Sequence, residues 1–239
     1  MCGYPSVSAD NHPVIPALRS ESAMNQPVEE RPGRQATAAA AMFEPGNWTQ
    51  TLDLSVMFDF QRTLEIDVGC GKGRFLLARA RNNPDVNYIG IDRMVKRLRK
   101  LDRKIDRTGL DNVRLLKTEA SYAFEELLPP ASANAIYTFF PDPWPKRRHH
   151  RRRLFCPAFC SALARVLAPR GHLHVSTDHL EYLAEISDLM LANGAFEPVD
   201  ALTLSEEERT NFEKTFLGLH TEIGRCSFRR MDVARSEQS

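Results

Sequence analysis

The stretch Thr63-Leu64-Glu65-Ile66-Asp67-Val68-Gly69-Cys70-Gly71-Lys72-Gly73 decides the fold that we predict for this chain. Its first six residues suit a buried strand, its glycines suit a tight turn, and a helical pattern follows at residues 74–82. Glycine tolerates positive φ and lets the backbone approach a ligand closely. The stretch therefore predicts the beginning of an α/β fold in which a ligand could bind at the first turn.

The alternation of strand and helix patterns continues outward from this stretch. The expected strands are residues 87–92, 112–117, 133–140 and 171–177, and the expected helices are residues 93–107, 122–128, 155–167 and 180–193. Alternating residues around 220–229 indicate an antiparallel closing pair. This spacing predicts a doubly wound, mostly parallel, seven-stranded Rossmann-like sheet.

Length and composition suit one domain with short additions. The chain has 239 residues, 42% of them hydrophobic, which is enough for one sizeable core. We expect a largely disordered arm at residues 1–45, which are rich in proline and small residues, a folded domain at 46–232, and a flexible tail at 233–239. Five cysteines without paired spacing and no apolar run of membrane-span length predict a cytoplasmic protein without a membrane partner.

Three acids are expected at the carboxyl edge of the sheet, beside the glycines Gly69 and Gly71. Asp67 precedes the turn. Asp92 ends the second strand, where such a carboxylate hydrogen-bonds a ribose diol, and Glu119 follows the third, where it could receive an adenine amino group. A dinucleotide usually has Gly-x-Gly-x-x-Gly, whereas the spacing here is Gly-x-Gly-x-Gly, led by a carboxylate that would repel a pyrophosphate. We therefore prefer the cationic amino-acid end of S-adenosylmethionine; a tight turn without any ligand is the alternative.

A second informative stretch runs from Phe139 to Arg153. Three prolines after an apolar strand place Asp142 at the strand's carboxyl end, and six Lys and Arg residues follow between Lys146 and Arg153. Because the net charge is only +1, this positive charge is local and suggests a site where each cation can neutralise a phosphate. The competing interpretation is a solvated charge run, and we expect Trp144 to pack beneath its loop.

The expected helix at residues 93–107 carries eight Lys and Arg residues, more than its acids can pair. It could extend an RNA footprint, which predicts binding that weakens steeply with salt.

Together these motifs resemble the bacterial tRNA (guanine-N7)-methyltransferases over about residues 48–230. The family's acid-led glycine loop, Gly-Ile-acid strand end, basic block, Thr-Asp pair and Thr-x-Phe-Glu read here as residues 67–73, 90–92, 140–153, 177–178 and 210–213. The acids at positions 67 and 92 are commonly Glu in the family, and the acid at 119 is commonly Asp.

The resemblance implies a class I methyltransferase fold and an enzyme that methylates N7 of the variable-loop guanine, position 46, of tRNA. It implies that S-adenosylmethionine is surrounded by Asp67, Asp92, Glu119 and Asp142, with Gly69 and Gly71 in the turn. It implies RNA contacts from Lys146, Asp178, Thr210, Asn211, Phe212 and Glu213. We expect no metal and no obligate protein partner, and either a monomer or a homodimer.

Guanine N7 has a free lone pair, so we expect positioning and electrostatics, rather than a general base, to carry the reaction. Our hypothesis is that Asp142 is catalytic: it accepts hydrogen bonds from the guanine edge and stabilises the charge formed on the ring, while Asp178 helps to hold the base. Each acid could instead be a cap or turn residue. A catalytically silent RNA-binding protein and a methyltransferase with a non-RNA substrate remain alternatives.

Overall fold

A computed structural model of the protein describes residues 41–232, and these form one compact unit. Residues 1–40 of the predicted arm and the predicted tail at 233–239 lie outside the described residues. Near the start of the described residues, strand β1 (Met42–Phe43) pairs with strand β4 (Val113–Lys117). The sheet thus begins before the predicted domain boundary at residue 46, because these two residues add to an open strand edge.

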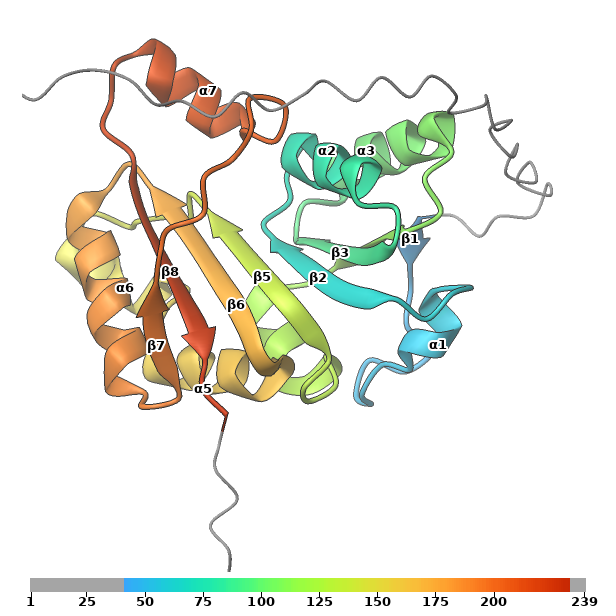
Figure 1. The fold of residues 1–239 in the computed structure, drawn as a ribbon, viewed down its shortest axis with the longest axis horizontal. Coiled ribbons are helices and arrows are strands. Elements are labelled where there is room, and N and C mark those ends of the chain that lie inside the picture. Colours follow the sequence, from blue (N-terminus) through green and yellow to red (C-terminus); the bar gives the residue numbers. More distant parts are fainter. Residues whose placement is uncertain (1–40, 233–239) are drawn as a thin grey trace, which may run out of the picture. The chain divides into compact units, whose positions relative to one another are not determined.

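The strands form a single sheet in the order β1-β4-β3-β2-β5-β6-β8-β7 (Figure 1). The remaining strands are β2 (Thr63–Val68), β3 (Val86–Asp92), β5 (Ala133–Phe139), β6 (Leu167–Thr177), β7 (Phe196–Val199) and β8 (Gly224–Arg230). Strand β8 runs antiparallel to both of its neighbours, β6 and β7, and the other strand pairs within residues 41–232 are parallel. The predicted doubly wound, mostly parallel sheet and its closing pair are confirmed, and β1 adds an eighth strand to the seven expected.

Helices cover both faces of the sheet (Figure 1). They are α1 (Leu54–Met57), α2 (Arg74–Asn82), α3 (Val95–Thr108), α4 (Ala120–Tyr122), α5 (Pro157–Val166), α6 (Leu180–Ala192) and α7 (Asn211–Gly218). Side chains of a strand alternate between faces. Accordingly, Tyr88 of β3 packs with α2 and α3, whereas its neighbour Ile89 packs in the core that α5 and α6 cover. No helix within residues 41–232 is long and apolar enough to cross a bilayer.

Two helical segments differ from the prediction. The helix expected at 122–128 is α4 followed by a π-helical turn, Ala123–Leu127. Helix α7 was not predicted, and it begins because the hydroxyl of Thr210 accepts a hydrogen bond from the Glu213 N–H at 3.0 Å, as an N-cap residue does.

The parallel strands place their carboxyl ends at one edge of the sheet, where α/β proteins bind ligands. Asp67 is the second-last residue of β2, Asp92 ends β3, and Asp142 and Asp178 follow β5 and β6. The topology therefore gathers the predicted acids at one edge, with β2 between β3 and β5.

Candidate active site

The glycine turn joins β2 to α2 and has backbone angles that favour glycine. Gly69, Gly71 and Gly73 have φ of 76°, 54° and 71°, and the Gly69 N–H donates to the Ile91 carbonyl at 2.8 Å. A side chain at Gly73 would collide with Leu101, 2.2 Å from the added Cβ, but one at Gly69 would meet nothing within 4 Å. The turn is thus packed against α3 at its end and open at its start, where a ligand could approach the backbone.

Asp67 is a buried carboxyl group that faces this open space. It lines the pocket beside the glycine turn, and the structure gives its side chain no hydrogen bond or ion pair with any residue in 41–232. Burial raises the pKa of Asp67 to about 7, and the neighbouring Asp92 carboxylate adds to the increase. A cationic group in the pocket would stabilise the ionised form, so the site is suited to an ammonium.

Asp92 is buried as well, but both of its oxygens are engaged. One accepts from the Gly71 N–H at 3.0 Å and the other from the Met94 N–H at 2.7 Å, and Arg97 approaches to 3.9 Å. Asp92 therefore holds the glycine turn against the start of α3. Contact with a ribose, the role that we predicted, would use the remaining acceptor capacity of this carboxylate.

The pocket at the sheet edge brings together residues that are far apart in the sequence. Of the predicted residues, it is lined by Asp67, Gly69, Gly71, Thr210, Asn211 and Phe212. The other side chains that line it had no individual role in our prediction, among them Lys72, Arg74, Phe75, Arg97, Phe139 and Thr215. Phe139 could have been found, because it ends the strand that leads to Asp142. Thr215 of α7 lies beyond the Thr-x-Phe-Glu motif at residues 210–213, so no motif pointed to it.

Glu119 lies outside the lining of this pocket. It is the residue before α4, its side chain is exposed, and it pairs with Arg93 at 3.7 Å. It shares the carboxyl edge of the sheet with the pocket, as predicted, but its contact with an adenine remains a prediction.

Asp142 also lies outside the pocket lining, on an exposed loop that is held in a strained conformation. Phe140 and Trp144, two residues away on either side, have φ of 54° and 43°, which costs about 1–3 kcal/mol each for non-glycine residues. The Phe140 N–H donates to the Ser176 carbonyl at 2.7 Å. The Asp142 side chain has no hydrogen bond or ion pair within the described residues, so it is available to a substrate.

Arg153 anchors the other end of this loop, and its burial corrects one of our expectations. Its Nε donates to the Pro143 carbonyl at 2.8 Å, and its guanidinium pairs with Glu185 of α6 and lies 4.6 Å from the Tyr182 ring centre. The side chain is only 1% exposed. The expectation that all six cations of the block could meet phosphate is therefore wrong for Arg153.

The other five cations of the block are exposed: Lys146, Arg147, Arg148, Arg151 and Arg152. Four of them lie in a 3-10 turn, Arg147–Arg152. Trp144 is half-buried against this turn, with its ring 5.8 Å from that of His149 and 4.9 Å from the Arg152 guanidinium, in agreement with packing beneath the loop. This part of the edge presents a dense positive surface.

The remaining predicted RNA contacts differ in exposure. Phe212 is 57% exposed and its ring lies 6.0 Å from that of Phe140. Glu213 is only 2% exposed and pairs with Arg225 of β8, so it presents no free carboxylate at the surface. Asp178 is half-buried and has no side-chain hydrogen bond or ion pair among residues 41–232.

Helix α3 carries the second basic surface. Leu98, Leu101 and Ile105 are buried, and all eight cations of residues 93–107 are exposed. Asp102, which could have neutralised some of this charge, accepts a hydrogen bond from the Met42 N–H at 3.1 Å. Much of the charge on α3 is therefore left facing solvent.

The sheet order, the acid-led glycine turn and the edge pocket define a class I methyltransferase fold. Solved structures agree: the 16S rRNA methyltransferase KamB superposes with a TM-score of 0.58 at 15% identity, covering 77% of this chain and 95% of that one. An antibiotic-related methyltransferase gives 0.54 at 20% identity, covering 77% and 98%. A family model described as "Putative methyltransferase" matches residues 61–225.

Curated relatives place the chain more closely. The tRNA (guanine-N(7)-)-methyltransferase of Nocardia farcinica is 43% identical over 63% of this chain and 54% of its own length. That of Nitrosococcus oceani is 33% identical over 69% of this chain and 70% of its own. The chain belongs to the tRNA (guanine-N7)-methyltransferase family. It spans 54–58% of the length of the first three relatives that it matches.

Proposed function

We propose that this protein transfers a methyl group from S-adenosylmethionine to N7 of guanine in tRNA, and that its target is the variable-loop guanine at position 46. The observation that carries the proposal is the unpaired, buried Asp67 carboxyl group in the glycine-turn pocket. The family and the names of the relatives support the substrate. The alternatives are RNA binding without catalysis and methylation of a substrate other than RNA.

The donor would be held by the ends of β2 and β3. Asp67 would receive the ammonium of its amino-acid end, and the exposed start of the glycine turn would accommodate its body. Asp92, already fixed by two backbone N–H groups, would reach the ribose, and Glu119 the adenine amino group. The pocket chemistry fits this molecule because a buried acid without a cation is costly and an ammonium offsets that cost.

The donor supplies an electrophilic methyl group on a positively charged sulfur. The guanine N7 lone pair forms the new N–C bond as the S–C bond breaks, so no proton has to leave before attack. Positive charge then appears on the purine ring. Asp142 would accept hydrogen bonds from the guanine edge and stabilise this charge, which is electrostatic catalysis by a preorganised group.

The RNA would be held by the exposed cations that flank the pocket. The block at residues 146–152 follows β5 and the basic helix α3 follows β3, so the two surfaces lie on either side of β2. Phosphates bound at both would present a base between them. Phe212, Thr210 and Asn211 would line the side of the pocket that receives the methyl acceptor, guanine, which we call the acceptor side. We expect the enzyme to meet tRNA in the cytoplasm.

The test is to incubate the purified protein with methyl-labelled S-adenosylmethionine and unmodified tRNA transcript, and then to map the product by cleavage at N7-methylguanine. Cleavage in the variable loop is the expected result. Salt-sensitive tRNA binding without methylation would favour the RNA-binding alternative. Absence of both would move the search to a non-RNA substrate.

A further inference from the structure

The segment that links β7 to α7, residues 200–210, leads directly into the acceptor side of the pocket. We call it the connecting segment. Its residues Leu202 and Leu204 pack with Phe75 of α2 and with Tyr137 and Phe139 of β5 in a small apolar cluster. The segment is thus attached to α2 and β5, although it follows them by more than sixty residues in the sequence.

Two arginines of α2 hold the part of the connecting segment that is nearest α7. Arg74 Nε donates to the Arg209 carbonyl at 2.9 Å, and its Nη2 donates to the Glu206 carbonyl at 3.3 Å. Arg79 Nη1 pairs with Glu208 Oε1 at 3.3 Å. These contacts end one residue before Thr210, the N-cap of α7.

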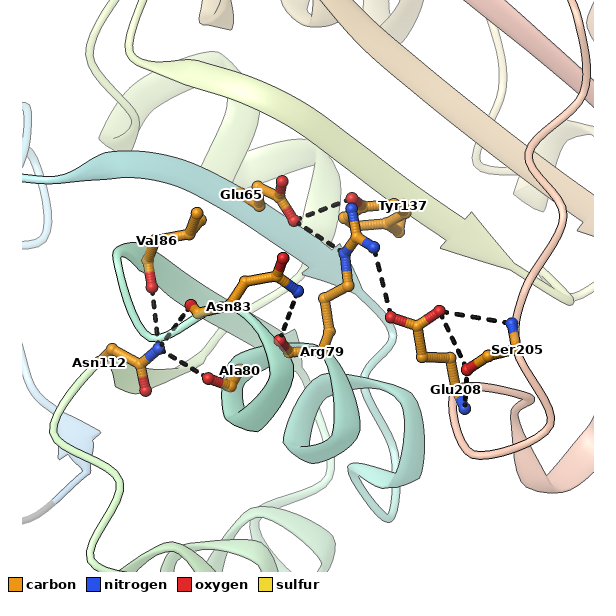
Figure 2. Close-up of polar contacts among 9 residues, drawn as sticks. All are labelled: Glu65, Arg79, Ala80, Asn83, Val86, Asn112, Tyr137, Ser205 and Glu208. Atoms are coloured by element: carbon orange, nitrogen blue, oxygen red, sulfur yellow. Dashed lines mark hydrogen bonds and ion pairs between the residues drawn. The ribbon is translucent and has the colours of Figure 1, made fainter. Parts of the chain in front are cut away.

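Arg79 also contacts the strand that leads to the glycine turn. Its Nε pairs with Glu65 Oε2 of β2 at 3.3 Å, and the Tyr137 hydroxyl donates to the same oxygen at 2.8 Å (Figure 2). The guanidinium therefore lies between two largely buried carboxylates, since the side chains of Glu65 and Glu208 are 14% and 10% exposed. Removing one partner of such a group leaves a buried charge uncompensated.

Glu208 is fixed within its own segment as well as by Arg79. Its second carboxylate oxygen accepts from the Ser205 N–H and hydroxyl, each at 3.4 Å (Figure 2). The ion pair with Arg79 therefore holds a hydrogen-bonded turn, residues 205–208, and not only one flexible side chain.

Helix α2, which carries both arginines, is held at its end by side-chain hydrogen bonds. The Asn112 amide donates to the carbonyls of Ala80, Asn83 and Val86 at 2.9–3.3 Å, and Asn83 donates to the Arg79 carbonyl at 2.9 Å. Figure 2 shows this amide beside the end of the helix, between Val86, Asn83 and Ala80. The carbonyls that end a helix lack partners within it; here the Asn112 amide donates to that of Ala80 and the Asn83 amide to that of Arg79.

Gly73, the last residue of the glycine turn, is the N-cap of helix α2. The same helix is thus joined at its start to the donor side of the pocket and, through Arg74 and Arg79, to the segment that carries Thr210, Asn211 and Phe212. We propose that Arg79 and Glu208 are positioning residues, which set the acceptor side of the pocket against the glycine turn and so control capture of the RNA substrate. This proposal rests on the proposed function, because it assigns the acceptor to the α7 side.

The test compares Glu208→Gln with Glu197→Gln, which removes one charge from the Arg229 pair between β7 and β8, at 2.7 Å, away from the pocket. For Glu208→Gln we expect the KM for tRNA to rise about fivefold or more, while the Kd of S-adenosylhomocysteine changes by less than about twofold. In the double variant Arg79→Gln/Glu208→Gln, the fold-increase in KM for tRNA should be well below the product of the fold-increases in the two single variants, as is expected for coupled residues. Glu197→Gln should leave both constants unchanged.

Amide hydrogen exchange provides a measurement that does not depend on activity. Exchange across residues 205–215 should be faster in Glu208→Gln than in the unsubstituted protein, and unchanged in Glu197→Gln. Unchanged exchange, or a KM that matches the control, would overturn the positioning role. Failure of the unsubstituted protein to methylate tRNA would instead count against the proposed function, and the exchange comparison would still decide whether Glu208 holds the segment.

Discussion

At the scale of single residues, Asp67 has the chemistry that depends most on pH. Its pKa is raised to about 7, so it loses its proton over the neutral range, whereas an ammonium ligand requires the ionised form. We expect the affinity for S-adenosylhomocysteine to rise roughly eightfold from pH 6 to pH 7.5, in proportion to the ionised fraction. Isothermal titration at several pH values measures this.

Asp67→Asn should bind the same ligand weakly and with a flat pH profile. Asp85→Asn, which changes an exposed acid before β3, should retain the slope. A pH dependence of affinity that persists in Asp67→Asn would assign it to another group.

The stability of the free protein should change with pH in the opposite direction. A carboxyl group whose pKa is raised in the folded state contributes stability at low pH, and this contribution is lost as the pH rises from about 4 towards 7.

Asp142 offers a second prediction at this scale. Asp142→Asn keeps the shape of the side chain but removes the charge that would face the methylated ring, so kcat should fall about a hundredfold. We assign Asp142 to the guanine and not to the donor contact that the resemblance also implied, so binding of S-adenosylhomocysteine should be unchanged, and a weakened affinity would instead assign Asp142 to the donor. Single-turnover methylation of tRNA measures the effect, with Asp111→Asn, an acid before β4, as the matched control. Normal turnover at unchanged substrate affinity would exclude a catalytic role.

At the scale of elements, α3 can be tested as an RNA surface. Replacing Lys96, Lys100 and Arg103 by Gln removes three exposed charges while Leu98 and Leu101 stay buried. The affinity for tRNA should fall, and the slope of log K against log salt should become shallower by about two to three, since each lost phosphate contact removes close to one unit. Filter binding at several salt concentrations measures the slope.

The control for α3 is Arg81→Gln/Arg170→Gln, which removes exposed cations near the amino edge of the sheet and should leave the slope nearly unchanged. If the α3 variant also keeps the original slope, the helix is a solvated charged face and the footprint is confined to the block at residues 146–152.

Elements with a local sequence pattern were the easiest to predict. The bounds of β2 and α2 agree with the prediction to the residue. The apolar strand, the glycine turn and the helix with its apolar residues can each be recognised within a few positions of the sequence. Helix α7 was missed, although Thr210 and Glu213 have the spacing of a helix cap. Its apolar residues Phe212, Phe216 and Leu217 are few and none of them is buried, whereas the polar Glu213 is, so this short helix has no buried apolar face of the kind that usually reveals one.

Contacts between distant segments could not be predicted in the same way. Arg153 reads in the sequence as one more cation of a basic block, and only its packing on Tyr182 and Glu185 of α6 shows that it is structural. Similarly, Arg79 and Glu208 are 129 positions apart, and neither belongs to a motif. Charged residues are informative about a surface only after the fold has decided which of them reach it.

At the scale of the whole molecule, binding in the pocket should stabilise the fold that forms it. A ligand that binds only the folded state adds about 2.7 kcal/mol at a concentration one hundred times its Kd, which corresponds to a rise in Tm of about 5–10 °C for a domain of this size. S-adenosylhomocysteine should produce this shift in differential scanning calorimetry. Methylthioadenosine lacks the amino-acid end and cannot pair with Asp67, so at the same concentration it should produce a much smaller rise in Tm. Equal shifts from the two ligands would show that the buried carboxyl group is not where the ammonium binds, and no shift from either would remove the glycine-turn pocket as the donor site.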